Sequence, residues 1–148
     1  MKTVITFGVF DFYHLGHLRL FRQIRQTVGE PCRLIVAVQK SEKTLIQKPE
    51  AKLLYSTEER CEMLAANRYI DQVITYEHVD DIIGRIEFDI LARAQEHRSP
   101  YFTILENWCN ANNKDIIITQ RTKGISSTLI RQKIAKDLIK QGEHFETQ

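Results

Sequence analysis

Short apolar runs alternate along this chain with stretches in which apolar residues recur at helical spacing. The runs are rich in β-branched residues and predict five strands, over 2–7, 33–38, 73–76, 89–92 and 116–118. The spacing between them predicts helices beginning near residues 18, 56, 80, 100 and 127. Strands that alternate with helices in this way are joined by right-handed crossovers. We therefore expect an α/β fold with a doubly wound, mostly parallel five-stranded sheet of the Rossmann-like type.

The detailed pattern makes three further predictions. Residues 39–54 are polar and rich in lysine, and are predicted to form a loop. Residues 80–88 are predicted to form a helix that turns Ile82, Ile83 and Ile86 inward. The last helix, over 127–139, is expected to pack through its apolar positions, which are Leu129, Ile130, Ile134, Leu138 and Ile139.

Polar clusters follow three of the predicted strands, where open parallel sheets bind their ligands. The first is the segment 8–17, the second is the lysine-rich loop, and the third is the segment 121–128. The lysines of the loop are candidates for anion binding, although solvated surface lysines are the ordinary alternative.

The segment 8–17 reads Gly-Val-Phe-Asp-Phe-Tyr-His-Leu-Gly-His and forms a turn from a strand to a helix. Gly8 permits a tight bend, and Gly16 leaves the backbone open where helix amides attract anions. His14 and His17 are three residues apart and project from one side of the first helical turn, which suits a phosphate. Two alternatives are histidines with a purely structural role and a zinc site with Asp11, for which no further Cys or His completes a familiar spacing.

The segment 121–128 carries Arg121, Lys123 and Gly124, followed by three hydroxyl residues at a helix start. One hydroxyl is enough to cap a helix, and here Ser126, Ser127 and Thr128 stand together. Hydroxyls, amides and a guanidinium make a suitable cradle for a polyphosphate. With the first turn, this segment predicts two anion sites that face one crevice.

Composition narrows the class of protein. The 148 residues suit one domain, expected over 1–142 with a frayed tail at 143–148. The formal net charge is only +2, so we do not expect a nucleic-acid partner. The sequence shows no long apolar span and no cleavable leader, so we do not expect a membrane location either. The cysteines (Cys32, Cys61 and Cys109) have no metal-like spacing and are typical of reduced thiols, so we expect a cytoplasmic protein.

Two anion sites without a nucleophile motif favour phosphoryl or nucleotidyl transfer. A phosphate monoester is largely dianionic near neutral pH, since its second pKa is about 6, and can attack without a general base. The protein has to align two anions that repel each other and to stabilise the charge of the transition state. Mg²⁺ is expected to enter on the triphosphate with few protein ligands.

The residues resemble a known family. Gly8 to His17 resembles the Gly-x-Phe-Asp-x-x-His-x-Gly-His motif of the cytidylyltransferases, and Arg121 to Thr128 is similar to their Arg-Thr-x-Gly-Ile-Ser-Thr-Thr motif, with Ser127 in place of a threonine. Residues 68–74 are similar to the family's Arg-Tyr-Val-Asp-Glu-Val-Ile segment, and 56–60 to its Ser-x-Glu-x-Arg helix start. The nearest subfamily by this resemblance is the bacterial glycerol-3-phosphate cytidylyltransferases, whose members are commonly dimers.

The resemblance implies a role for each matching residue. The catalytic residues would be His14, His17, Lys52 and Arg121. The nucleotide would be bound by Gly8, Phe10, Asp11, Gly16, Arg68, Arg121, Gly124, Ile125, Ser126, Ser127 and Thr128. Lys48, Arg93 and His97 would face the second substrate. The implied metal ion is Mg²⁺ carried by CTP, and no protein ligands for a metal are assigned.

One segment departs from the family pattern. The glycerol-phosphate enzymes carry Gly-Asp-Asp-Trp after the fourth strand, whereas residues 94–97 here read Ala-Gln-Glu-His. The leading hypothesis is an enzyme that joins CTP to a small phosphate monoester similar to glycerol 3-phosphate, releasing pyrophosphate and feeding the synthesis of a capsule or teichoic-acid-like polymer. The alternatives are an adenylyltransferase of the same superfamily and a non-catalytic nucleotide-binding protein.

Overall fold

The computed structural model describes residues 1–97, 99–120 and 124–146, and their side chains as far as residue 142. The strands are β1 (Lys2–Gly8), β2 (Cys32–Gln39), β3 (Gln72–Tyr76), β4 (Ile90–Ala94) and β5 (Asp115–Thr119). The helices are α1 (Leu15–Val28), α2 (Ser41–Gln47), α3 (Thr57–Ala65), α4 (Pro100–Ala111) and α5 (Ser127–Glu146), with a short 3-10 helix, η1 (Val79–Ile82).

The five strands form one sheet in the order β3-β2-β1-β4-β5, and every pairing is parallel. In the centre, Val4 of β1 lies in register with Leu34 of β2 and with Ile90 of β4. The predicted doubly wound fold is therefore confirmed, and the sheet is parallel throughout. The strand order reverses at β1, which places the ligand-binding crevice of such folds beside the carboxyl end of this strand.

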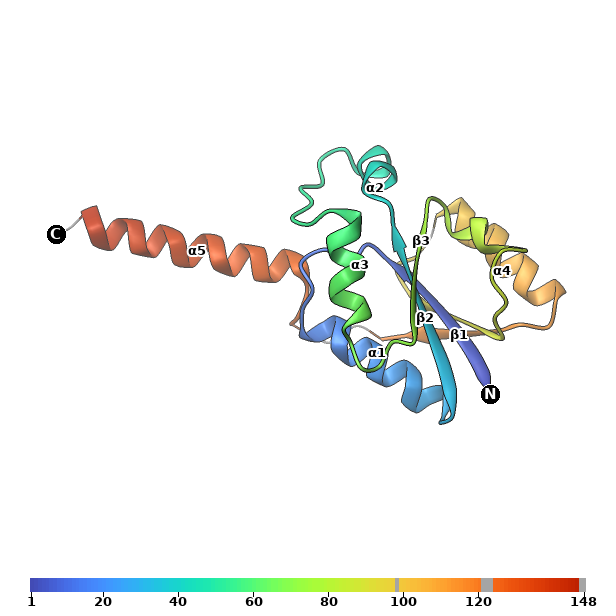
Figure 1. The fold of residues 1–148 in the computed structure, drawn as a ribbon. Coiled ribbons are helices and arrows are strands. Elements are labelled where there is room, and N and C mark those ends of the chain that lie inside the picture. Colours follow the sequence, from blue (N-terminus) through green and yellow to red (C-terminus); the bar gives the residue numbers. More distant parts are fainter. Residues whose placement is uncertain (98, 121–123, 147–148) are drawn as a thin grey trace.

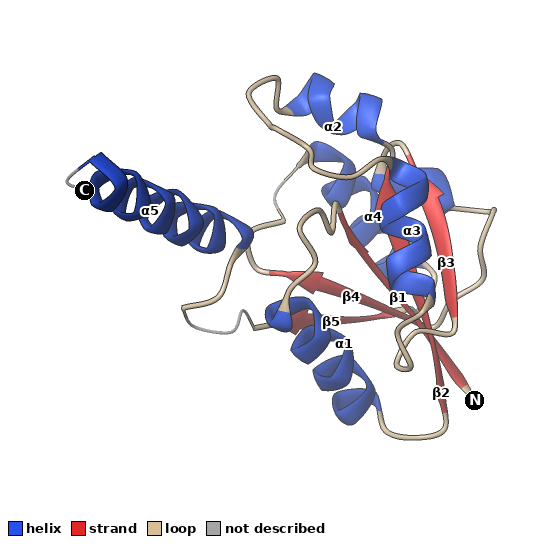
Figure 2. Ribbon diagram, turned by 60° about the vertical axis from the view of Figure 1, so that its left-hand side comes forward, coloured by secondary structure: helices blue, strands red, loops and turns tan. Residues whose placement is uncertain are grey.

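Helices cover both faces of the sheet (Figures 1 and 2). On one face, Val4 packs with side chains of α1 and α3, among them Phe21, Ile24 and Leu64. On the other face, Ile5 packs with α4 and η1, whose contributions include Ile82, Phe102 and Leu105. Successive residues of β1 thus serve the two layers in turn, as the alternation of a strand requires.

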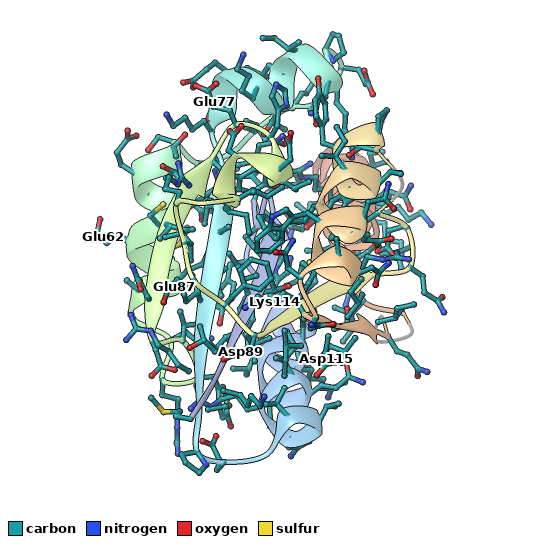
Figure 3. The ribbon with its side chains drawn as sticks, turned by 90° about the vertical axis from the view of Figure 1, so that its right-hand side faces the viewer. Glu62, Glu77, Glu87, Asp89, Lys114 and Asp115 are labelled. Atoms are coloured by element: carbon teal, nitrogen blue, oxygen red, sulfur yellow. The ribbon has the colours of Figure 1, made fainter. Side chains whose placement is uncertain are left out.

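The two ends of the sheet are distinct. Figure 3 shows Glu77, which follows β3, at one end. Asp89, Lys114 and Asp115, at the starts of β4 and β5, lie at the opposite end. The carboxyl ends of the strands therefore share the end that Glu77 marks, which is where the candidate site was predicted.

Two predictions for the connecting segments were wrong. The expected loop over 39–54 contains α2, whose Thr44 hydroxyl donates to Gln39 Oε1 at 3.0 Å. The expected helix over 80–88 is limited to η1, because the chain turns away and Gly84 has a φ of +77°. The inward side chains were predicted correctly, since Ile82 is fully buried and both Ile83 and Ile86 pack against the same core.

Helix α5 differs most from expectation. It runs to Glu146 rather than 139 and projects away from the body of the molecule (Figures 1 and 2). Leu138 and Ile139, expected to pack inward, are each 62% exposed, and Leu129 and Ile134 are also exposed. The predicted packing of this helix on its own sheet is therefore wrong. No helix within the described ranges combines the length and the apolar character that a membrane span needs.

Candidate functional site

Two histidines cap the N-terminus of α1 with their own rings. His14 Nδ1 accepts the Gly16 N–H at 2.9 Å, and His17 Nδ1 accepts the His14 N–H at 3.1 Å. The rings are stacked, with centroids 3.9 Å apart and planes at 25°. An imidazole that accepts at Nδ1 carries its proton on Nε2. Each ring is thus fixed in the tautomer that has an Nε2–H donor.

The His17 ring is held in its neutral form. Burial is the main cause, and together with the neighbouring His14 it lowers the pKa of His17 to about 3. The helix amides were expected to be open to an anion, and here that expectation is wrong for two of them. The Gly16 N–H is taken by His14 Nδ1, and the His17 N–H donates to the His14 carbonyl at 3.0 Å. The donors that this turn offers an anion are therefore the imidazole Nε2–H groups and not these two helix amides.

Glycine at two positions makes this turn possible. A Cβ at Gly16 would lie 2.7 Å from His14 Cε1, and a Cβ at Gly8 would lie 2.8 Å from Phe10 Cζ. Phe10 has a φ of 55°, is 6% exposed and packs edge-on against His17 at 5.4 Å. The structure thus places Phe10 beneath His17, as a support from the core.

Asp11 joins three segments. Its carboxylate, in a residue that is 7% exposed, accepts the N–H groups of Leu54 at 2.8 Å and Tyr55 at 3.0 Å. It also accepts a hydrogen bond from Arg131 of α5 at 2.8 Å. Asp11 therefore holds the segment 8–17 to the loop before α3 and to the last helix.

The first and last polar segments converge. The Ser127 hydroxyl donates to the Asp11 carbonyl at 3.2 Å, and Ile125 Cγ2 lies 3.4 Å from the position of a Cβ on Gly16. Ser126 caps α5, since its hydroxyl accepts the Leu129 N–H at 3.1 Å. These contacts show that two segments far apart in the sequence lie against each other; that they face one crevice stays a prediction.

The remaining residues of the last segment are placed differently. Gly124 is exposed and has a φ of +75°, and Thr128 is exposed on the first turn of α5. Arg121 and Lys123 lie outside the described residues. A role for Arg121 therefore stays a prediction.

A small cavity lies beside the turn, at the carboxyl ends of the strands. Its volume is about 230 Å³. Ligand pockets for drug-sized molecules usually measure about 300–1,000 Å³, so this cavity fits a small molecule better than a whole nucleoside triphosphate. Its lining includes Gly8 of the turn together with Lys48, Glu96 and His97.

The other predicted cations lie apart from one another. Lys48 lines the cavity, whereas Lys52 is exposed in the following loop. Arg93 forms an ion pair with Glu106 of α4 and does not line the cavity. Arg68 is exposed, with its guanidinium carbon 5.7 Å from the ring centroid of Tyr69. The structure thus brings Lys48 and His97 together and leaves Lys52, Arg68 and Arg93 outside the cavity.

The sequence did not lead us to predict a structural role for Arg60. This residue is fully buried in α3, and its guanidinium donates to the carbonyls of Val9 at 2.7 Å and Gln39 at 2.9 Å. It also donates to the Ser41 hydroxyl at 2.8 Å, and burial lowers its pKa. Arg60 thus ties the ends of β1 and β2 to the start of α2. Its place in the helix-start motif was the only signal, since helical arginines are usually exposed.

Within the described residues, no group of three or more His, Cys, Asp or Glu side chains is arranged to hold a metal ion. Asp11, the carboxylate considered for zinc with the two histidines, is occupied by backbone amides and Arg131. The donors at this end of the sheet are hydroxyls, imidazoles and cations, which suit an anion.

Comparison with known proteins agrees with this chemistry. Residues 5–133 match the model of the cytidylyltransferase-like family. Over 137 residues the chain is 33% identical to a glycerol-3-phosphate cytidylyltransferase of Staphylococcus aureus, covering 90% of this chain and 96% of that protein. It is 32% identical to the enzyme of the same name from Bacillus subtilis, with 91% and 98% covered.

A solved structure of a lipopolysaccharide core biosynthesis protein from Thermoplasma volcanium shares the fold. Its TM-score is 0.66 at 16% identity, and the match covers 83% of this chain and 99% of that one. Since the family model matches most of the chain, the protein belongs to the cytidylyltransferase-like family. The relatives named as cytidylyltransferases support a nucleotidyltransferase activity of that kind.

Proposed function

We propose that this protein transfers the cytidylyl group of CTP to a small phosphate monoester similar to glycerol 3-phosphate, giving a CDP-linked product and pyrophosphate. One observation carries the proposal. The turn that carries the stacked imidazoles of His14 and His17 contacts the start of α5, where the Ser127 hydroxyl donates to the Asp11 carbonyl, and a small cavity that includes Lys48 adjoins the same turn. The relatives named as glycerol-3-phosphate cytidylyltransferases support the choice of CTP.

The proposed reaction needs no protein nucleophile. An oxygen of the monoester attacks the α-phosphorus of CTP, a new P–O bond forms, and the bond to the β-phosphate breaks as pyrophosphate leaves with its electron pair. The Nε2–H groups of His14 and His17 would donate to the α-phosphate as charge grows on its oxygens. Ser126, Ser127 and Arg121 would hold the β- and γ-phosphates, as the resemblance implies. Lys48 would hold the phosphate of the second substrate.

Mg²⁺ is proposed to enter on the triphosphate, whose oxygens are the hard ligands that this ion prefers. When bound, it would neutralise part of the charge on the phosphates. The donors that the chain itself offers at this site are imidazoles, hydroxyls and Lys48, which complement phosphates.

The test is pyrophosphate release in the presence of Mg²⁺, with CTP or ATP and a panel of phosphate monoesters. The proposal expects turnover with CTP and at least one small monoester. Turnover with ATP instead would establish the adenylyltransferase alternative. CTP binding by calorimetry without turnover on any monoester would establish the non-catalytic alternative.

We also propose a homodimer that works in the cytoplasm and feeds a surface-polymer pathway. Support for the dimer comes from α5, where Leu129, Ile134, Leu138 and Ile139 are exposed along a projecting helix. A second copy would bury these side chains at about 25 cal/mol per Å² of apolar surface. Sedimentation should show a dimer that Ile134→Lys with Leu138→Lys dissociates, and a wild-type monomer at all concentrations would contradict it.

A further inference from the structure

The turn over 94–97 holds the His97 ring through hydrogen bonds and a ring stack. His97 Nδ1 accepts the Ala94 N–H at 3.3 Å, and the His97 N–H donates to the Ala94 carbonyl at 3.2 Å. The ring is stacked on Phe102 of α4, with centroids 4.6 Å apart and planes at 14°. These contacts fix both the position of the ring and the identity of the nitrogen that accepts.

Arg93 and Glu106 hold this turn from behind. The Arg93 guanidinium donates to the Ala94 carbonyl at 3.0 Å and to the His97 carbonyl at 3.5 Å. Glu106 of α4 forms an ion pair with the same guanidinium. The side chains of Arg93 and Glu106 are 19% and 27% exposed, so this pair is only partly screened by water. Arg93, which was expected to contact the second substrate, thus connects both ends of the turn to α4.

The ring nitrogen left for a ligand is Nε2. Because Nδ1 accepts a backbone N–H, a neutral ring has its proton on Nε2 and can only donate from there. Burial lowers the pKa of His97, with Arg93 and Lys48 acting in the same direction and Glu96 opposing them, which supports the neutral form. His97 lines the cavity, and the hydrogen-bond donor that its neutral ring can offer a ligand there is the Nε2–H.

We infer that the turn over 94–97, held by Arg93 and Glu106, presents His97 Nε2–H to a hydroxyl oxygen of the second substrate, and so selects hydroxylated phosphate monoesters over monoesters that carry an ammonium group. This inference rests on the proposed function and deepens it. A hydroxyl accepts from an N–H, whereas an ammonium group has no lone pair to offer and is repelled by Lys48 in the same cavity. Glu96 also lines the cavity and is the group that would favour an ammonium, so Glu96→Gln is included in the test below.

The experiment measures pyrophosphate release with CTP and Mg²⁺ on two probes, glycerol phosphate and ethanolamine phosphate. The wild type should prefer glycerol phosphate in kcat/KM by about tenfold or more, the effect of leaving a donor unpaired. His97→Phe keeps the stack on Phe102 and removes the donor. It should raise the KM for glycerol phosphate about 3- to 10-fold and leave the KM for CTP unchanged, as the loss of one neutral hydrogen bond predicts.

Three further variants separate positioning from a structural role. His97→Gln keeps an amide donor and should recover part of the lost affinity for glycerol phosphate. Glu106→Gln should also raise the KM for glycerol phosphate. When it is combined with His97→Phe, this KM should rise little further, because both changes act on one hydrogen bond. Glu62→Gln, on the exposed surface of α3, is the matched control and should change neither KM. A purely structural effect would instead lower thermal stability and the yield of active enzyme at constant KM.

Each outcome decides the question. Preference for ethanolamine phosphate, especially one abolished by Glu96→Gln, would overturn the inference and leave the proposed cytidylyltransferase standing. An unchanged KM for glycerol phosphate in His97→Phe would also overturn it. No pyrophosphate release from CTP with any monoester would refute the proposed function, and this inference with it.

Discussion

Replacing Asp11 by asparagine tests the contact that joins the first turn to the rest of the site. In Asp11→Asn, one carboxylate oxygen becomes an NH₂ group. Oδ2 is the atom that receives both the Leu54 N–H and Arg131, each at 2.8 Å. An NH₂ group there would face two donors, and if the amide were turned round, it would face the Tyr55 N–H instead. Every orientation therefore leaves a partly buried backbone donor without an acceptor.

The magnitude follows from these contacts. A hydrogen bond to a charged group contributes about 1.5–3 kcal/mol, and leaving a buried donor unpaired costs about 1–3 kcal/mol. The Arg131 side chain is 42% exposed, so it can be solvated when its partner is lost. Losing its ion pair should therefore contribute only about 0–1 kcal/mol to the change in the free energy of unfolding. We expect Asp11→Asn to lower the free energy of unfolding by about 2–4 kcal/mol. At about 2–4 °C per kcal/mol, Tm would fall by roughly 4–16 °C.

The assay is urea unfolding of the wild type, Asp11→Asn, Arg131→Met and the double variant. Asp137→Asn, on the exposed surface of α5, is the matched control and should be neutral. The double-mutant cycle should give a coupling below about 1 kcal/mol, with most of the loss caused by the amides of the loop before α3. A loss below about 1 kcal/mol in Asp11→Asn, or one that Arg131→Met reproduces in full, would refute this reasoning.

Substitutions at four other positions test the turn and its support. His14→Ala and His17→Ala should each lower kcat by two to three orders of magnitude, roughly the effect of removing a transition-state donor, and near-normal turnover would contradict their roles. Because burial lowers the pKa of His17 to about 3, its unfolded form takes up a proton first. Stability should thus fall as pH drops from about 6.5 toward 3, by at most about 1.4 kcal/mol per pH unit from this group, and His17→Gln should flatten the slope in unfolding curves measured across that range. In Gly16→Ala the new Cβ would meet the His14 ring at 2.7 Å, so kcat should fall more than stability does; an unchanged kcat would show that the ring can move aside. Arg60→Met leaves the Val9 and Gln39 carbonyls without their donor and should cost about 3–5 kcal/mol in denaturant unfolding, a prediction that an unchanged midpoint would defeat.

The sheet was predictable because its central strands, β1 and β2, are buried on both faces, and all five strands read as short apolar runs. The contact between the segment 8–17 and residues 125–127 followed from topology, since both come after parallel strands of one sheet. Helix α2 was not predictable, because it is seven residues long and depends on tertiary contacts such as that between Thr44 and Gln39. The projection of α5 was also not predictable. Apolar residues at helical spacing predict an apolar face, but they do not indicate whether that face packs on the same chain.

Side-chain roles were harder to predict than positions. Asp11 was expected at the nucleotide, and its carboxylate holds the loop before α3 and Arg131. Arg93 was expected at the second substrate, and it pairs with Glu106. In both cases the partner lies far away in the sequence, so the choice between binding a ligand and holding the scaffold depends on contacts that only the fold brings together.

The central claim is that the histidine turn and the start of α5 bind a single triphosphate. Hydrogen exchange of the full chain, measured by mass spectrometry with and without CTP and Mg²⁺, tests it without any substitution. We expect slower exchange in peptides that cover 8–17 and 124–131 at the same CTP concentration, and no change in peptides from the opposite end of the sheet, over 84–89 and 112–115. Protection of only one of the two segments, or protection at half-saturating concentrations that differ between them, would contradict the claim.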